Sequence, residues 1–145
     1  MSGGKGSQEG GCACGALRYR VTGELRPVVA CHCSQCRKAF TNFGAFSAAW
    51  RGDLHIENET AIAWYVSSPG VRRGFCSRCG SALFWDRDGN DFVSISAGSF
   101  DQPSGLKQVR HIYVDDKADF YEVADGLEVL PQGQGSDSWP DGRPS

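Results

Sequence analysis

The segment CSRCGSALFW, residues 76–85, joins two cysteines and a glycine to an apolar run. A C-x-x-C-G turn bends back on itself and directs both sulfurs to one centre, while its glycine can take the positive φ that frees backbone N–H groups for the thiolates. Two further clusters precede it, CACG at residues 12–15 and CHCSQC at residues 31–36. All seven cysteines fall in these three clusters, and their close spacing indicates metal ligands rather than disulfides.

Length and charge limit the class of protein. The chain has 145 residues, which favours a single domain, and its 15 Lys and Arg against 17 Asp and Glu give a formal net charge of −2. This balance predicts no binding to nucleic acid or to an anionic membrane, and no apolar run approaches the ~20 residues of a membrane span. The start of the sequence has no apolar stretch typical of a signal peptide, so we expect a cytoplasmic protein. The sequence indicates nothing about the oligomeric state.

Short alternating segments predict a mainly β fold. Leu17, Tyr19 and Val21 alternate with polar residues, which is typical of a half-buried strand. A helix of one or two turns is expected over 35–40 with Ser34 as its N-cap, and a hairpin is expected around residues 86–90. We therefore expect a single domain of mainly antiparallel β-sheet. The strands are expected at residues 17–21, 28–33, 43–50, 61–66, 81–85, 92–95 and 111–114.

Composition also sets the expected domain boundaries. Residues 1–10 are rich in Gly and Ser and are expected to be a flexible segment. Residues 11–131 are expected to form a zinc-binding β domain. Residues 132–145, which include Trp139, are rich in Gly, Ser, Pro and Asp and are expected to be a flexible tail.

Seven thiols divide naturally between two zinc ions. A structural zinc takes four ligands in a closed tetrahedron, whereas a reactive zinc takes three and keeps one position open. The two clusters that end in glycine supply Cys12, Cys14, Cys76 and Cys79 for a closed site. Cys31, Cys33 and Cys36 then form a three-thiolate site within one local loop.

Counting alone leaves other partitions open. The three-thiolate loop could instead join Cys12 or Cys14, and a single zinc with spare thiols satisfies the same count. His32 or a distant residue could also close the second site, which would make both zinc ions structural. Iron could replace zinc in such thiolate sites.

The order of these motifs resembles the glutathione-dependent formaldehyde-activating enzyme family, which includes centromere protein V. The resemblance rests on the clusters at 12–15 and 31–36 and on SSPGVRRGFCSRCGSALF at 67–84. It continues at residues 98–101, 111–112 and 125–127, and it spans residues 11–131. The sequence departs from many relatives at residues 39–42, AFTN, where they carry a Ser-Gly pair, so we expect a different substrate rim.

The resemblance implies a tent-like assembly of small antiparallel sheets built around a structural zinc. It assigns that zinc to Cys12, Cys14, Cys76 and Cys79, and it assigns a catalytic zinc to Cys31, Cys33 and Cys36. The implied activity is that of a carbon–sulfur lyase, which condenses glutathione with formaldehyde to S-hydroxymethylglutathione or acts on a related thiol adduct.

Four residues are candidate helpers for such chemistry. Arg72 or Arg73 could bind a glutathione carboxylate, although a solvated pair on a turn is the simpler interpretation. Alternation along the strand directs His32 away from the neighbouring thiols, and His111 could line the pocket or make a structural hydrogen bond. Two alternatives to an enzyme stay open: a zinc-stabilised β module that binds a protein partner, and a thiol-redox or metal-storage protein.

Overall fold

The structure, a computed structural model, describes residues 7–133. Of the tail expected to be flexible, residues 134–145, including Trp139, lie outside the described residues, as do residues 1–6. The first strand begins at Gln8, within the segment 1–10 expected to be flexible, because Gln8 pairs with Val21 of the next strand.

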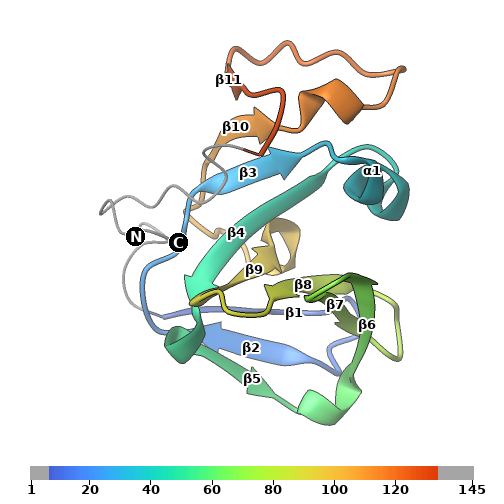
Figure 1. Ribbon diagram of the computed structural model, residues 1–145. Coiled ribbons are helices and arrows are strands. Elements are labelled where there is room, and N and C mark those ends of the chain that lie inside the picture. Colours follow the sequence, from blue (N-terminus) through green and yellow to red (C-terminus); the bar gives the residue numbers. More distant parts are fainter. Residues whose placement is uncertain (1–6, 134–145) are drawn as a thin grey trace.

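Two β-sheets make up the domain (Figure 1), which confirms the mainly β prediction. The larger sheet has the order β11-β10-β3-β4-β9-β8-β7-β6, and the smaller has the order β1-β2-β5. Neighbouring strands are antiparallel except that β10 runs parallel to both β3 and β11. The strands are β1 (Gln8–Gly11), β2 (Arg18–Val21), β3 (Val28–Cys31), β4 (Gly44–Trp50), β5 (Leu54–Glu57), β6 (Ile62–Ser68), β7 (Val71–Cys76), β8 (Ala82–Arg87), β9 (Phe92–Ser96), β10 (Gln108–Ile112) and β11 (Glu128–Val129).

Helical structure is short throughout. The helix α1 (Ser34–Phe40) follows β3, and single 3₁₀ turns occur at η1 (Arg51–Asp53), η2 (Glu59–Ala61), η3 (Ala97–Ser99) and η4 (Val114–Asp116). Within residues 7–133, no helix is long and apolar enough to cross a membrane. The expected helix is therefore confirmed, but its N-cap is Cys33 and not Ser34: the Cys33 sulfur accepts a hydrogen bond from the Cys36 N–H.

The core lies between the two sheets. The inward residues of β2 and the residue before it, Leu17, Tyr19 and Val21, are at most 1% exposed, as their alternation predicts. The Tyr19 ring meets Phe84 of β8 and Phe100 edge-on, with centroids 5.7 and 5.4 Å apart. This packing fixes the smaller sheet against the larger one.

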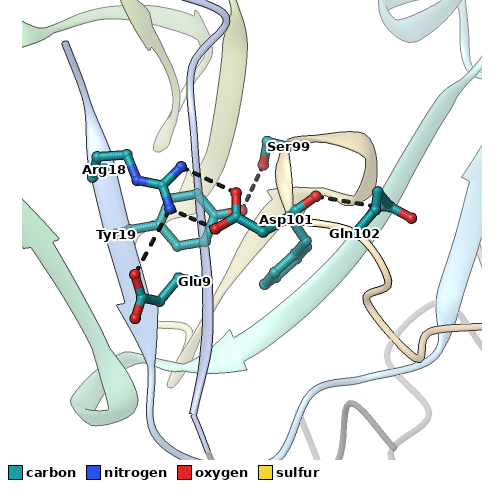
Figure 2. Close-up of polar contacts among 7 residues, drawn as sticks. Glu9, Arg18, Tyr19, Ser99, Asp101 and Gln102 are labelled. Atoms are coloured by element: carbon teal, nitrogen blue, oxygen red, sulfur yellow. Dashed lines mark hydrogen bonds and ion pairs between the residues drawn. The ribbon is translucent and has the colours of Figure 1, made fainter. Parts of the chain in front are cut away.

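Polar contacts close one end of the same interface (Figure 2). Arg18 donates two hydrogen bonds to the Asp101 carboxylate, at 2.6 and 3.1 Å, and Glu9 lies 3.7 Å from the same guanidinium. Behind this ion pair, the Tyr19 and Ser99 hydroxyls are 2.6 Å apart. These contacts connect β1 and β2 to the segment that follows η3.

Several strands were not expected from the sequence. Strand β5 carries the polar-rich sequence LHIE and pairs with β2 at the edge of the smaller sheet. Strand β7 has the sequence VRRGFC, in which Arg73 is buried. Its apolar and polar residues therefore do not alternate in the way that predicts a half-buried strand. The hairpin between β8 and β9 was expected, and it turns at Gly89 with a positive φ.

Candidate metal and thiol site

Cys12, Cys14, Cys76 and Cys79 come together at the junction of the two sheets. Cys12 and Cys14 lie in the turn between β1 and β2, and Cys76 and Cys79 lie at the turn between β7 and β8. The four sulfurs all lie within 4.8 Å of one another. The glycines that follow each pair, Gly15 and Gly80, have φ of 83° and 80°. Both take the left-handed conformation expected from the sequence, which non-glycine residues rarely adopt.

This group has the dimensions of a zinc site. With Zn–S bonds of about 2.3 Å, the edge of a ZnS₄ tetrahedron is about 3.8 Å. The Cys12–Cys14 and Cys14–Cys76 sulfur distances are 3.6 and 3.8 Å. Backbone N–H groups of Leu17 and Arg78 donate to the Cys12 and Cys76 sulfurs, at 3.3 and 3.4 Å. The donor set therefore fits zinc, and the residues could hold it in a closed shell.

The four thiols differ in how readily they ionise. The Ser81 hydroxyl and backbone lower the pKa of the Cys79 thiol to about 5, and the Ser81 oxygen lies 3.1 Å from the Cys79 sulfur. The pKa of Cys14 is raised to about 11, with the neighbouring cysteine thiols among the causes. Cys79 is thus the thiol of this group that most readily forms the thiolate, which is the form that binds a metal ion.

Cys31, Cys33 and Cys36 form a second group around the start of α1. Cys31 ends β3, Cys33 caps the helix, and Cys36 lies in its first turn. Their sulfurs also lie within 4.8 Å of one another, and in residues 7–133 no other His, Cys, Asp or Glu belongs to this group. The group therefore offers three soft ligands and no fourth one, which is compatible with a zinc that keeps an open position.

Crowding makes the three thiols unequal in charge. Interaction with the Cys31 and Cys36 thiols lowers the pKa of Cys33 to about 2. The pKa of Cys31 is strongly raised, first by Cys33 and Cys36 and then by burial. One thiolate in the group thus opposes the ionisation of its neighbours, and a bound cation would reduce this repulsion.

A cavity of about 480 Å³ opens beside the three thiols. Its wall includes two buried arginines, Arg26 and Arg73, which are 3% and 7% exposed. Arg73 Nη2 lies 3.7 Å from the Cys36 sulfur and 3.5 Å from Gln35 Oε1. Within residues 7–133 the Arg73 Nε has no hydrogen-bond partner, so a buried donor is available at the cavity.

The structure separates the two arginines that the sequence treated alike. Arg73 lines the cavity, whereas Arg72 is exposed and pairs with Asp86 at 3.1 Å. The Arg72 guanidinium also lies over the Trp64 ring, 3.8 Å from its centroid. Arg72 therefore has a structural role on the outer face of β7, and of these two residues only Arg73 lines the cavity.

His32 and His111 lie behind the thiols and outside the cavity wall. Both are fully buried, and their Nε2 and Nδ1 atoms are joined by a hydrogen bond of 2.8 Å. A second hydrogen bond of 2.8 Å joins His111 Nε2 to Asp125 Oδ2. Burial, followed by the nearby charge of His111 and Lys117, lowers the pKa of His32 to about 4. His111 thus makes a structural hydrogen bond, one of the two roles considered from the sequence.

Sequence reasoning missed three contributors to this region. Arg26 follows no motif, and nothing in the sequence indicates that it lines the cavity. Gln35 lies inside the CHCSQC cluster, but its contact with Arg73 joins residues 38 apart in the chain. Asp125 lies in the segment 125–127, one of the motifs that the chain shares with the family. The one signal in the sequence for its role is that a buried histidine needs a hydrogen-bond partner.

The fold and these groups define a small, cysteine-rich β domain with two places that could bind metal. Comparison with known proteins identifies the class further. The chain belongs to the glutathione-dependent formaldehyde-activating enzyme family, whose sequence profile matches residues 7–116.

Individual relatives agree with this assignment. An uncharacterized lyase of Schizosaccharomyces pombe is 31% identical over 124 residues, which cover 84% of this chain and 89% of the relative. A Halomonas elongata protein, named provisionally as a glutathione-dependent formaldehyde-activating enzyme, is 35% identical over 128 residues, 79% of this chain and 80% of the relative. A crystal structure of a Rhodobacter sphaeroides protein shares the fold with a TM-score of 0.57 at 21% identity, covering 70% of this chain and 99% of that one.

Proposed function

We propose that this chain is a zinc-dependent carbon–sulfur lyase or synthase that acts on glutathione or a related thiol adduct, as an S-hydroxymethylglutathione synthase does. The observation that carries the proposal is the group of Cys31, Cys33 and Cys36, whose sulfurs meet beside a cavity with no fourth ligand in residues 7–133. Membership of the family and the enzyme names of its relatives support the same reaction class. We place the activity in the cytoplasm, where thiols stay reduced.

The two cysteine groups have different roles in this proposal. Cys12, Cys14, Cys76 and Cys79 hold a structural zinc, and Cys31, Cys33 and Cys36 hold a catalytic zinc. When bound, a zinc ion held by these three cysteines would supply a Lewis acid that lowers the pKa of a substrate thiol. The three cysteines are therefore both the metal ligands and the catalytic centre.

Residues of the cavity wall bind and orient the substrate. The Arg73 guanidinium provides a buried donor for a carboxylate, and it donates a hydrogen bond to Gln35 Oε1. Because Arg73 also lies 3.7 Å from the Cys36 sulfur, its positive charge stabilises the ionised thiol there. A peptide thiol with a free carboxylate is thus bound with its sulfur next to the three cysteines.

The reaction then needs little more than placement. The sulfur lone pair of the thiolate forms a bond to the aldehyde carbon, the π electrons of the C=O bond move to oxygen, and that oxygen takes the proton that the thiol released. Cleavage runs the same steps backwards, with the sulfur as the leaving group. Since the uncatalysed addition is feasible, holding the two reactants together supplies much of the rate. The cavity volume of about 480 Å³ lies within the usual range for small-molecule sites.

Isothermal titration of reduced glutathione into zinc-loaded protein tests the proposal. We expect a binding signal for glutathione and a weaker one for 2-mercaptoethanol, which has no carboxylate for Arg73. The zinc content, measured with a chromophoric chelator, should be two ions per chain in the wild type and one in Cys36→Ser. Absence of heat for every thiol contradicts the enzymatic role, and a content well above two indicates metal storage instead.

A further inference from the structure

His32, His111 and Asp125 form a hydrogen-bonded chain behind the three thiols, here called the His–His–Asp chain. Two contacts of 2.8 Å link His32 Nε2 to His111 Nδ1 and His111 Nε2 to Asp125 Oδ2. The Asp125 carboxylate is also held at its other oxygen, which accepts a hydrogen bond of 3.0 Å from the Leu127 N–H. The chain thus runs from an exposed loop near the end of the domain to a histidine between two cysteines.

The carboxylate determines where each proton lies. The hydrogen bond from His111 lowers the pKa of Asp125, so the carboxylate is ionised and can only accept. His111 must then carry a proton on Nε2, and in the neutral imidazole this leaves Nδ1 as an acceptor. With both rings neutral, the hydrogen bond between them places a proton on His32 Nε2 and none on His32 Nδ1.

The packing around His32 is consistent with a ring that is held rather than one that reacts. Its ring lies 5.0 Å from Phe43 and is stacked on Tyr121 at 5.8 Å, measured between centroids. Its Nδ1 is buried and has no hydrogen-bond partner among residues 7–133. An orientation that leaves a buried acceptor unpaired needs another contact to maintain it, and the hydrogen bond to His111 is that contact.

Holding this ring also holds the thiols on either side. His32 lies between Cys31 and Cys33, and its backbone N–H donates to Ile112 O at 2.9 Å. Strands β3 and β10 run in parallel here, with Cys31 opposite Ile112. Because successive side chains of an extended segment point to opposite sides, the direction of the His32 ring sets the direction of both neighbouring sulfurs.

We infer that His111 and Asp125 are positioning residues for the three-thiol group, since they fix His32 in one tautomer and one orientation and thereby aim Cys31 and Cys33 at a common centre. The inference rests on the proposed function in one respect, namely that this group binds a metal ion. Partners that orient ligands in this indirect way typically change metal affinity by about 10–100-fold when removed.

Titration of the metal-free protein with Co²⁺ tests the inference, with thiolate-to-cobalt absorption as the signal. The wild type should bind two equivalents, and Cys36→Ser identifies the absorption of the second. We expect Asp125→Ala to weaken the second equivalent about tenfold or more and to leave the first unchanged. Asp125→Asn keeps an acceptor oxygen, so its affinity for the second equivalent should lie between those of Asp125→Ala and the wild type. Asp119→Ala removes an exposed carboxylate from the same loop and should have no effect.

Nitrogen-detected NMR of the imidazole rings gives a second measurement that needs no metal. The chain has three histidines, and the exposed His55 serves as an internal reference. We expect His32 and His111 both to carry the proton on Nε2 in the wild type and to lose this fixed tautomer in Asp125→Ala. If Asp125→Ala fails to fold, Asp125→Asn carries both measurements, because it preserves the size of the side chain.

The outcomes separate the two proposals. A wild type that binds one Co²⁺ contradicts the three-thiol metal site, and the positioning role falls with it. A wild type that binds two, together with an Asp125→Ala variant whose second equivalent is unchanged, overturns the positioning role alone. An equal loss at both equivalents, or a proton on His111 Nδ1, also overturns it.

Discussion

The two cysteine groups should differ in what they contribute to stability, and the substitutions Cys79→Ser and Cys36→Ser test this. The first group joins segments 62 residues apart along the chain, whereas Cys31 and Cys36 lie in one short loop. On the chain-entropy relation for cross-links, closing a loop of 62 residues is worth about 4 kcal/mol, and closing one of about five residues is worth about 2 kcal/mol. The free energy of unfolding should therefore fall more in Cys79→Ser.

Thermal unfolding followed by circular dichroism measures the difference. For a domain of this size, about 1 kcal/mol corresponds to about 2–4 °C in Tm, so Cys79→Ser should lose about 10 °C and Cys36→Ser about half of that or less. Cys36→Ser should in addition lose turnover while it keeps the wild-type far-ultraviolet spectrum. Added chelator removes the metal from both groups and should therefore bring the wild type below the level of Cys79→Ser. If Tm falls by the same amount in both variants, the assignment of one group as structural and the other as catalytic is wrong.

Two further substitutions probe the cavity and the sheet interface. Replacing Arg73 by Met should weaken glutathione binding about 10–100-fold in Kd, because a charged hydrogen bond is worth about 1.5–3 kcal/mol, while binding of 2-mercaptoethanol, which has no carboxylate, should weaken much less. Arg72→Met is the matched control, and an equal loss there would remove the reason for choosing Arg73. Asp101→Asn should lower stability at pH 7 by up to about 1 kcal/mol, since the Arg18–Asp101 pair is largely exposed. The hydrogen bond from Arg18 lowers the pKa of Asp101, so this stabilisation is present above the carboxyl's ordinary pKa and is lost as the pH falls through the lowered one. The Tm difference from the wild type should close in acid, and a difference that grows there would contradict the ion pair.

Most of what could be predicted from the sequence came from the spacing of residues that are close together along the chain. The four cysteines of the first group are flanked by turns whose glycines take the positive φ that the C-G pattern predicts, at Gly15 and Gly80. The alternation of Leu17, Tyr19 and Val21 likewise predicts the buried face of β2. Both signals work because a few neighbouring residues determine them.

The parts that the sequence did not reveal depend on distant pairing. β10 lies parallel to β3, which is an arrangement that needs a long connection and leaves no local turn signal. The contact between His32 and His111, 79 residues apart, follows from this pairing. Arg73 was ambiguous for a similar reason: its burial depends on Gln35 and Cys36, which belong to another element.

The positions of the two groups suit the proposed division between a structural and a catalytic site. The four-thiol group lies where the two sheets meet, so a metal ion there strengthens the frame without depending on any substrate. The three-thiol group lies at the start of the seven-residue helix α1, and it is held from behind by β10, through the His32–Ile112 backbone contact and the His–His–Asp chain. Holding the loop from the far side leaves the cavity side clear of a protein ligand in residues 7–133. A residue that coordinated the metal directly would orient the thiols equally well, but it would fill the position that a substrate sulfur needs.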